Sequence, residues 1–458
     1  MNFSADAFKA YDIRGRFPDE LNEELAYQIG RAFVELYNPK VVVIGRDVRL
    51  TSQSFAKALA NGFIDAGCDV WDIGLCGTEQ VYHATAAWNA DGGVMITASH
   101  NPMEYNGFKL VGPEARPISS DTGLFDIRDR IFKEAFPVGP VEEIPKGKVI
   151  ERDSMDSYIQ LLLQMVPAAQ MKPLKVVVNG GNGCAGPVVE ALAKHLPLKL
   201  IPMNLTPDGT FPNGIPNPLL PDRRAATAQA VVENQADFGV AWDGDFDRCF
   251  LFDAKGRFID SYYLVGFLAE IFLKKEPGGR IIYDPRLVWN TEEEVKTLGG
   301  KPIASRGGHA FMKETLRKVN AIYGGEASGH HFFREFHWCD SGMLPWLYVA
   351  AELSHQGRTL AEVVEERMEK FPTSGEMNRI VDDAPSIIQK IEDEYSPSAE
   401  KVMHLDGIGI DYPNWRFNLR SSNTEPVIRL NLETRGDQGL LKEKTEELLA
   451  KIGGRPQE

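Results

Sequence analysis

Short apolar runs rich in β-branched residues alternate with helical patterns along most of this chain, and the alternation restarts three times. The restarts lie near residues 40, 174 and 279. Strands that alternate with helices are typical of α/β folds, in which helices cover a mostly parallel sheet. The apolar runs are KVVVIGRD (40–47), DVWDIGL (69–75), GGVMITAS (92–99), LKVVVNGGNG (174–183), LKLIPMN (198–204), DFGVAWDGD (237–245), GRIIYDPR (279–286), KPIASRGGH (301–309) and AIYGGEASGH (321–330). The pattern predicts three related α/β domains.

From about residue 370 onward, the predicted helices and strands follow one another in a different order. A helical IIQKIEDEY precedes strand-like WRFNLR and EPVIRLNLET, and a helical LLKEKTEELLAK follows, which predicts a small α+β domain. Stretches rich in proline, glycine and charge at 136–148, 253–257 and 371–376 indicate boundaries. We therefore expect four domains, with the boundaries 1–147, 148–253, 254–369 and 370–458.

Charge, hydropathy and cysteine content exclude several classes of protein. The net charge of -15 argues against a nucleic-acid partner, which needs a basic surface. We expect no membrane span, because no apolar run reaches about 18 residues, and no secretion signal at the N-terminus. The five cysteines are widely spaced, which favours reduced thiols and a cytoplasmic protein. An acidic chain that binds an anionic substrate needs a local basic site.

The stretch MITASHNPMEYNGFK, residues 95–109, places Ser99 directly after an apolar run. An ordinary turn serine is one interpretation. A hydrolase nucleophile is excluded, since that motif needs glycine where Thr97 and Asn101 stand. We also expect His100 to point away from Ser99 if the backbone there is extended. Ser99 alone decides nothing.

The stretch WDGDFDRCF, residues 242–250, contains three carboxylates within five residues. They are Asp243, Asp245 and Asp247, and they repel one another unless a cation lies among them. Hard oxygen ligands suit Mg²⁺ or Ca²⁺, whereas a solvated acidic turn is the alternative. An EF-hand is excluded, because Arg248 and Ala254 occupy its glycine and glutamate positions.

The stretch GGNGCAG, residues 180–186, matches the glycine spacing of a dinucleotide-binding turn. Such a site needs an acidic residue about 20 positions later, where the next apolar run ends in Met203 and Asn204. We therefore interpret this stretch as a tight strand-to-helix turn.

Two further polar loops suggest a phosphorylated sugar as ligand. RSSNTEP (420–426) offers a guanidinium, hydroxyls and backbone amides suited to a phosphate, although a polar hairpin turn has the same composition. GGEASGHH (324–331) offers mixed donors and acceptors suited to a polyhydroxylated ligand. Together with the carboxylate loop, they indicate phosphoryl transfer to a sugar, in which a phosphorylated Ser99 would be the donor.

The chain resembles the α-D-phosphohexomutase family, and most closely the bacterial phosphomannomutases. TASHNP, DGDFDR, GEASGH and RSSNTEP occur in the same order as the four signature loops of that family. AYDIRG (10–15), YNGFK (105–109) and PDGTFPNGIPNP (207–218) are also similar. The resemblance implies four domains around a central cleft, three of them α/β with mixed sheets and the last α+β, each contributing one loop.

The resemblance also implies the reaction. A phosphoserine at position 99 donates to a sugar monophosphate, and the resulting hexose 1,6-bisphosphate turns around and returns its other phosphoryl group. The net result is interconversion of mannose 6-phosphate and mannose 1-phosphate, with Mg²⁺ held by the aspartates and an oxygen of the phosphoserine. The protein is then expected to be a monomer or homodimer that binds phosphorylated hexoses.

Family positions assign a role to each candidate residue, with Lys109 as the leading acid/base group. The catalytic candidates are Ser99, Lys109, Arg14, His100 and Arg248. The candidates for sugar binding are Glu326, Ser328, His330, His309, Arg306, Arg286, Tyr11 and Asn101. The candidates for phosphate binding are Arg420, Ser422, Asn423 and Thr424, and the metal ligands are Ser99, Asp243, Asp245 and Asp247.

Substrate preference is the part of this interpretation with alternatives. Phe246 stands where many relatives have glycine, and Ala327 stands where methionine is common. SNT and GEASGH favour mannose or glucose phosphates over glucosamine phosphate, so a phosphoglucomutase or a dual-specificity mutase is the nearest alternative.

A phosphatase of the haloacid dehalogenase type, an alternative from another class, expects threonine or valine at Asp247 and leaves Ser99 without a role. The remaining alternative is a sugar-phosphate-binding protein without catalysis.

Overall fold

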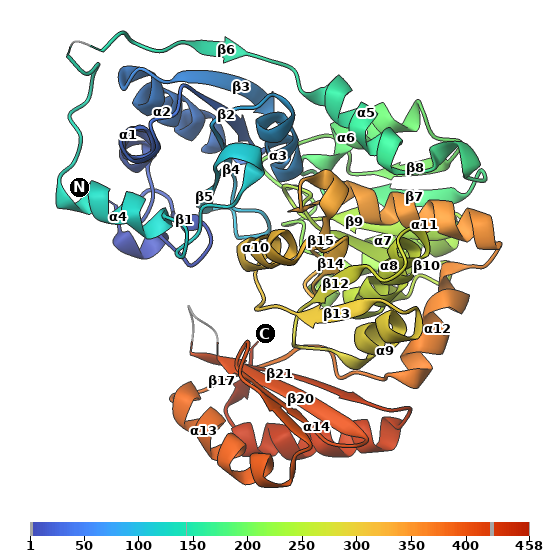
Figure 1. Ribbon diagram of the computed structural model, residues 1–458. Coiled ribbons are helices and arrows are strands. Elements are labelled where there is room, and N and C mark those ends of the chain that lie inside the picture. Colours follow the sequence, from blue (N-terminus) through green and yellow to red (C-terminus); the bar gives the residue numbers. More distant parts are fainter. Residues whose placement is uncertain (1–2, 143, 422–425, 458) are drawn as a thin grey trace. The chain divides into compact units, whose positions relative to one another are not determined.

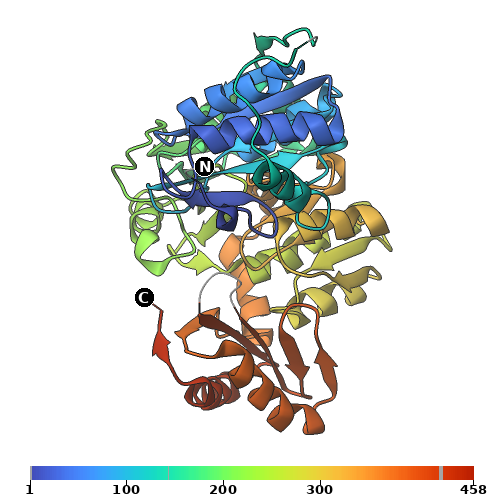
Figure 2. The ribbon, with the colours of Figure 1, turned by 90° about the vertical axis from the view of Figure 1, so that its left-hand side faces the viewer.

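The computed structural model describes residues 3–142, 144–421 and 426–457. The chain divides into two compact units (Figures 1 and 2). The first unit comprises residues 1–258 and 330–357, and the second comprises residues 259–329 and 358–458. In the described part of the chain, no helix combines the length and the apolar character that a membrane crossing needs.

The N-terminal sheet of the first unit has six strands in the order β1-β5-β4-β2-β3-β6. They are β1 (Ile13–Arg16), β2 (Val41–Arg46), β3 (Asp69–Leu75), β4 (Gly92–Ile96), β5 (Tyr105–Val111) and β6 (Val149–Glu151). β2 is parallel to β3 and β4, whereas β5 is antiparallel to β4 and β1, so the sheet is mixed. Four helices accompany it, namely α1 (Glu23–Tyr37), α2 (Ser52–Asp65), α3 (Thr78–Ala87) and α4 (Leu124–Lys133).

Both faces of this sheet are covered. Successive side chains of a strand point to opposite faces, so Val42 and Ile44 enter one core and Val43 enters another. The first core is shared with α1, α2 and α4, and the second with α3. Figure 1 shows α1 and α2 side by side, on the opposite side of the sheet from α3. This leaves the carboxyl ends of the parallel strands to carry polar loops.

A second sheet of the first unit has the order β11-β10-β9-β7-β8. Its strands are β7 (Lys175–Asn179), β8 (Lys199–Met203), β9 (Phe238–Trp242), β10 (Cys249–Asp253) and β11 (Phe258–Ile259), and its helices are α5 (Met155–Met165), α6 (Ala185–Ala193) and α7 (Ala225–Glu233). β7 is parallel to β8 and β9, whereas β10 is antiparallel to β9.

The glycine-rich stretch 180–186 is a tight turn between β7 and α6, as predicted. A Cβ on Gly183 would lie 2.6 Å from the backbone oxygen of Gly244, so the glycine allows this turn to pack against the loop after β9. The first unit also contains the antiparallel pair β15 (His331–Phe333) and β16 (Cys339–Asp340), followed by α11 (Met343–Gln356).

The second unit contains a parallel group of strands and an antiparallel sheet. β12 (Arg280–Tyr283) is parallel to β13 (Lys301–Ala304) and β14 (Tyr323–Gly325). The accompanying helices are α8 (Ser261–Lys275), α9 (Trp289–Thr297), α10 (His309–Val319) and α12 (Leu360–Lys370). The antiparallel sheet has the order β18-β19-β20-β21-β17-β22. Its elements are β17 (Met377–Ile380), β18 (Lys401–Met403), β19 (Ile408–Asp411), β20 (Trp415–Ser421), β21 (Val427–Thr434) and β22 (Arg455–Pro456), with α13 (Ala384–Tyr395) and α14 (Gln438–Ile452) packed on it.

The nine apolar runs of the sequence form the strands that were predicted for them. These are β2, β3, β4, β7, β8, β9, β12, β13 and β14. Three observations of the structure bear on the predicted domain boundaries. β6 extends the first sheet past residue 147, and residues 253–257 form the turn between β10 and β11. Residues 330–357 group with the first unit and not with the rest of the predicted third domain. The three boundaries between the four domains therefore remain a prediction.

Candidate active site

Ser99 lies in the loop that follows the carboxyl end of β4 and has a left-handed backbone, with φ of +49°. Its amide donates to Thr97 Oγ1 at 2.8 Å. Its hydroxyl donates to Asp243 Oδ2 at 2.6 Å, in the loop between β9 and β10. The serine and the carboxylate loop of the sequence therefore meet inside the first unit.

The three aspartates of that loop, Asp243, Asp245 and Asp247, are all fully buried. One carboxylate oxygen from each lies within 4.8 Å of the other two. Within the described residues, Oδ1 of Asp245 and Oδ1 of Asp247 are buried without a hydrogen-bond partner. Buried oxygens that lack a donor and face like charges favour a bound cation, and an all-oxygen donor set suits Mg²⁺. The loop therefore fits a magnesium ion.

Lys109, on β5, provides a positive charge against this loop. Its Nζ donates to Asp245 Oδ2 at 2.7 Å and contacts Asp247 Oδ2. Burial favours the neutral amine, but the two aspartates outweigh burial and raise the pKa of Lys109. The aspartates differ from each other as well. Burial and the Asp245 charge raise the pKa of Asp247, whereas for Asp245 the Lys109 ammonium outweighs burial and lowers the pKa.

Arg248 and His100 flank the Ser99 hydroxyl. Arg248 donates from Nε and Nη2 to Asp243 Oδ2, at 2.9 and 2.7 Å, and its Nη2 lies 3.3 Å from Ser99 Oγ. The same Nη2 contacts His100 Nδ1, which lies 3.1 Å from Ser99 Oγ. Burial and the Arg248 charge lower the pKa of His100 well below its ordinary value, so its imidazole is neutral.

The condition under which His100 was expected to point away from Ser99 is therefore not met. That expectation assumed an extended backbone, in which adjacent side chains diverge. The left-handed conformation of Ser99 turns the chain, so that the two side chains converge on the same point.

Arg14 and Asn101 belong to the same region of the first unit. Arg14, on β1, donates to Asn101 Oδ1 at 2.6 Å and to Asp12 Oδ2 at 2.5 Å. Tyr11 lies just before β1 and is 36% exposed. These contacts hold the Arg14 side chain toward the loop that carries Ser99.

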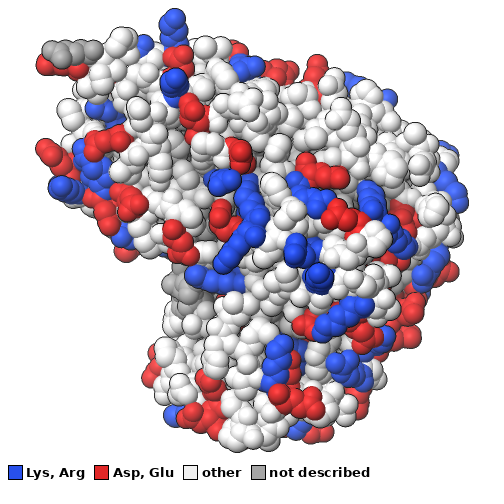
Figure 3. Space-filling view, viewed as in Figure 1, with Lys and Arg blue, Asp and Glu red and all other residues white. Residues whose placement is uncertain are grey.

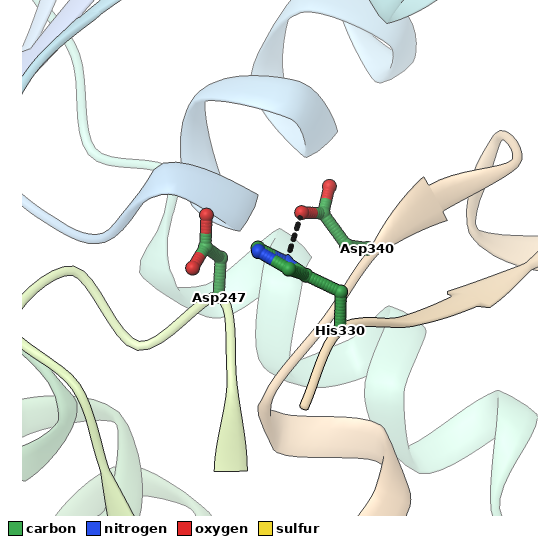
Figure 4. Close-up of side chains that lie close together, drawn as sticks. All are labelled: Asp247, His330 and Asp340. Carbon is green, nitrogen blue, oxygen red and sulfur yellow. Dashed lines mark ion pairs between the residues drawn. The ribbon is translucent and has the colours of Figure 1, made fainter. Parts of the chain in front are cut away.

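His330 approaches the aspartate loop from a separate part of the first unit. Figure 4 shows its imidazole between Asp247 and Asp340, and its Nδ1 lies 2.9 Å from Asp340 Oδ2. One donor atom from each of these three residues lies within 4.8 Å of the others. The contact with Asp340 orients the imidazole, and a neutral imidazole carries a lone pair that can accept a proton.

The second unit gathers its own candidates around Arg286, which follows β12. Arg286 forms a fork with Asp284, at 2.9 and 2.8 Å, and its Nη2 lies 3.4 Å from Ser328 Oγ. Glu326 Oε1 lies 4.0 Å from the Arg286 guanidinium and accepts from the Gly308 amide at 2.6 Å. The two sugar-binding candidates of the GEASGH loop thus lie beside a buried arginine.

Glu376 joins this group to the C-terminal sheet of the second unit. Its carboxylate lies 3.7 Å from Arg286, 3.1 Å from Arg420 and 3.3 Å from Arg429. Burial opposes ionisation, but the three guanidinium groups, Arg286 foremost, lower the pKa of Glu376 to about 2. Arginines grouped around a carboxylate offer guanidinium donors that suit a phosphate.

The remaining candidates of the second unit lie near α10. His309 is the first residue of α10 and is buried, and the Arg306 guanidinium lies 3.8 Å from the centre of the Phe311 ring. Ser422, Asn423 and Thr424 lie outside the described residues.

Four residues at these sites were missed from the sequence: Arg49, Thr78, Asp340 and Glu376. Thr78 donates to Asp245 Oδ2 at 2.5 Å, and its amide donates to the Asp245 carbonyl at 3.1 Å. Arg49 donates to the Ser99 carbonyl at 2.9 Å. Arg49 follows the carboxyl end of β2, so the rule that ligands bind at strand ends could have found it. Thr78 follows the carboxyl end of β3 in the same way, whereas the sequence contains no comparable signal for Glu376.

The surface carries both signs of charge. Figure 3 shows acidic and basic side chains interspersed over the face of the molecule that it draws. A nucleic-acid-binding protein needs instead a continuous basic surface.

Comparison with known families identifies all four parts of the chain. Residues 5–138, 156–256 and 260–371 match the phosphoglucomutase/phosphomannomutase alpha/beta/alpha domains I, II and III. Residues 376–451 match the C-terminal domain of the same family. The α/β fold class and the resemblance found in the sequence are thereby confirmed.

Individual relatives are similar over almost their whole length. A protein of Xanthomonas campestris pv. campestris named "Phosphohexose mutases" is 55% identical over 442 residues, which cover 96% of this chain and 98% of the relative. The phosphomannomutase of Escherichia coli strain K12 is 53% identical, with the same coverage. The crystal structure of a phosphoglucomutase/phosphomannomutase family protein from Burkholderia thailandensis has a TM-score of 0.87 and 30% identity, and covers 99% of both chains.

Proposed function

The chain belongs to the phosphoglucomutase/phosphomannomutase family, and from that premise we propose that it interconverts mannose 6-phosphate and mannose 1-phosphate. It is a phosphohexomutase, an isomerase that moves a phosphoryl group within a sugar phosphate. The observation that carries the proposal is the contact between Ser99 Oγ and Asp243 in a loop of three buried carboxylates. The names of relatives more than 50% identical support mannose as the sugar.

Ser99 carries a phosphoryl group in the active enzyme. In the first transfer, the bond between phosphorus and Ser99 Oγ breaks, a bond to the sugar O1 or O6 forms, and that sugar hydroxyl gives up its proton. The product is a hexose 1,6-bisphosphate. After the bisphosphate has turned around, its other phosphoryl group returns to Ser99 Oγ, and the sugar oxygen regains a proton.

Asp243, Asp245 and Asp247 would hold Mg²⁺ together with an oxygen of the phosphoserine. When bound, the ion neutralises negative charge on the phosphoryl group during transfer. Arg248 adds a fixed positive charge beside Ser99 Oγ, because two of its nitrogens are already anchored on Asp243.

Two groups are placed to handle the proton of the sugar hydroxyl. The raised pKa of Lys109 keeps it charged, so it starts the cycle as a proton donor and must lose a proton before it can accept one. His330, oriented by Asp340, is the second candidate, since a neutral imidazole can accept a proton directly. Arg14 and the neutral His100 contribute beside Ser99 by binding and orientation.

The second unit supplies the groups that hold the sugar and its other phosphate. Glu326 and Ser328 bind sugar hydroxyls beside Arg286, and Arg420 binds the phosphate that is not reacting. The remaining proposed contacts are those of Tyr11, Asn101, Arg306, His309, Ser422, Asn423 and Thr424. We also retain the four proposed domains, 1–147, 148–253, 254–369 and 370–458, each contributing one loop.

The test measures turnover of mannose 1-phosphate, glucose 1-phosphate and glucosamine 1-phosphate side by side, with Mg²⁺ and a catalytic amount of hexose 1,6-bisphosphate. We expect the largest kcat/KM for mannose 1-phosphate. A larger value for glucose 1-phosphate or glucosamine 1-phosphate would show that the sugar is assigned incorrectly.

Ser99→Ala tests the phosphoserine. Loss of a covalent nucleophile should lower kcat by about 10⁴-fold or more, and mass spectrometry should find phosphate on Ser99 in the wild type only. Ser120→Ala, at a partly exposed serine of the same unit, is the matched control and should retain full activity. Phosphate on Asp243, or substantial turnover by Ser99→Ala, would contradict the mechanism.

A further inference from the structure

Arg49 is a buried arginine that the mechanism above does not use. It lies between β2 and α2, in the segment GRDVR of residues 45–49, and is 3% exposed. Its guanidinium donates all four of its terminal hydrogen bonds to backbone carbonyls of one loop. That loop is the one that carries Ser99.

The four carbonyls belong to residues 99–105. Nη2 donates to the carbonyls of Ser99 and Asn101, at 2.9 and 2.5 Å. Nη1 donates to the carbonyls of Pro102 and Tyr105, at 2.7 and 2.9 Å. Buried carbonyls need donors, and a planar fork can satisfy several of them in one fixed geometry. The loop therefore folds around the guanidinium.

The loop needs such support because Ser99 adopts a conformation that non-glycine residues avoid. Its φ is +49°, and its carbonyl lies so close to Gly244 that a Cβ there would be 2.5 Å from the carbonyl oxygen. With this carbonyl held by Arg49 on one side, the Ser99 hydroxyl is directed to Asp243 on the other. A small rotation of the loop would separate Ser99 Oγ from Asp243.

Arg49 is itself held from several sides. Its Nε lies 3.4 Å from Asp47 Oδ2, and Asp47 accepts from Ser52 Oγ at 2.6 Å and from the Arg49 amide at 2.9 Å. The Phe211 ring, in the PDGTFPNGIPNP stretch, lies 5.7 Å from the guanidinium carbon. The charge of the guanidinium is thus balanced within the core, and the side chain has little freedom to move.

We propose that Arg49 is a positioning residue, which fixes the Ser99 loop so that the phosphoserine faces the aspartate loop. The inference rests on the proposed function of Ser99. Arg49 touches neither substrate nor the reacting oxygen in this role, and acts through the backbone of residues 99–105. This role of Arg49 also gives a structural reason for Phe211, in the motif at 207–218, because its ring packs against the guanidinium.

Arg49→Lys keeps the charge but replaces a planar fork by a single ammonium that cannot reach four carbonyls. We expect kcat to fall by about 30-fold or more with KM within about threefold, because a displacement near 1 Å costs about 10²-fold. Hydrogen exchange of the backbone amides of residues 99–105 should accelerate. Guanidinium ion, added to Arg49→Ala below unfolding concentrations, should restore part of kcat.

Arg31→Lys is the matched control. Arg31 is buried in the same unit and donates to the carbonyls of Pro137 and Gly139, at 2.8 and 3.2 Å, in a different segment. We expect a comparable loss of thermal stability but an unchanged kcat. If Arg49→Lys folds and neither kcat nor the exchange at residues 99–105 differs from Arg31→Lys, the proposal is overturned.

Two further outcomes, an Arg49→Lys variant that does not fold and a wild type that is inactive, are distinguished by separate measurements. If Arg49→Lys does not fold, Asp47→Asn replaces it: faster exchange at 99–105 with a lower kcat supports the proposal, and no change in either overturns it. If the wild type neither isomerises sugar phosphates nor carries phosphate on Ser99, the proposed function has failed. In that case the exchange measurement still decides whether Arg49 holds the loop.

Discussion

The two units of the molecule each contain a cluster of charged side chains, and the two clusters differ in how their charges are balanced and buried. The Ser99 cluster, in the first unit, consists of Ser99 and five charged groups, which are Asp243, Asp245, Asp247, Lys109 and Arg248. Three carboxylates there face two cations. The Arg286 cluster, in the second unit, consists of Arg286, Arg420, Arg429, Asp284, Glu326 and Glu376, so that three guanidinium groups face three carboxylates.

The carboxyl groups show the difference directly. Burial and neighbouring aspartates raise the pKa of Asp247, whereas three arginines lower the pKa of Glu376 to about 2 despite burial. A cluster with excess carboxylate favours a cation, whereas partly exposed guanidinium groups around a shared carboxylate can bind another anion in its place. The comparison teaches that, in the proposed function, the aspartate loop of one unit would hold the metal and the arginines of the other unit would bind a phosphate.

The largest effect is expected from Asp247→Asn. Loss of one carboxylate from the aspartate loop should lower kcat by about 10³-fold, since charge stabilisation of this kind contributes several kcal/mol. The same change should raise the melting temperature of EDTA-treated protein by a few degrees, because it removes a buried like charge. Mg²⁺ should stabilise the wild type but not the variant in thermal melts.

The stability of the metal-free protein should depend on pH because of the Asp247 carboxyl group. Because the folded pKa of Asp247 lies above its unfolded value, its contribution to stability is complete below the unfolded pKa and is lost as pH rises through the folded pKa. The control is Asp253→Asn, at a buried carboxylate that pairs with Arg257 in the next turn, which should lose stability and keep activity. Lower stability of metal-free Asp247→Asn at neutral pH would contradict the account of the Ser99 cluster.

A smaller effect is expected from Arg420→Ala in the Arg286 cluster. Loss of a charge-assisted contact to the phosphate that is not reacting should raise KM by about 10- to 100-fold and lower kcat less. Initial-rate kinetics with mannose 1-phosphate measure this. Arg435→Ala removes an arginine that packs on Trp289 instead and should leave KM unchanged. A variant with a normal KM and a reduced kcat would show that Arg420 acts on the transferred phosphate.

The smallest effect is expected from Glu376→Gln. Its folded pKa lies below the unfolded value, so its contribution to stability is present above the unfolded pKa and is lost as pH falls through about 2. The variant should lose roughly 1–2 kcal/mol of unfolding free energy at neutral pH and bind inorganic phosphate a few-fold more tightly, because the arginines lose a competing anion. Urea melts and calorimetric titration measure the two effects.

Glu366→Gln, at an exposed carboxylate of the second unit, is the control and should change neither quantity. Weaker phosphate binding by Glu376→Gln would mean that Glu376 orients the arginines and does not compete with the ligand.

Elements with a strong local pattern could be predicted from the sequence. The run KVVVIGRD forms β2, GGVMITAS forms β4, and the glycine-rich stretch after β7 forms a tight turn. Hydrophobic periodicity and turn chemistry act over a few residues, so they can be recognised without knowledge of the fold. Ser99 and the three aspartates could be found for a related reason, since each motif concentrates its chemistry in one short segment.

Other features could not be predicted, because they depend on chain segments that are distant in sequence. The direction of His100 depends on a left-handed φ at Ser99 that carbonyl contacts to Arg49, 50 residues away, stabilise. Thr78 reaches Asp245 across 167 residues.

The sequence by itself determined the alternation of strands and helices around its strongest apolar runs, the family, and the groups proposed to carry the chemistry, because such information lies in short contiguous patterns. Only the tertiary structure decided which side chains support those groups and which carboxyl groups give up their protons readily. The physical reason is that hydrogen bonds and electrostatic interactions depend on distance in space, and the fold brings together residues that no local pattern connects.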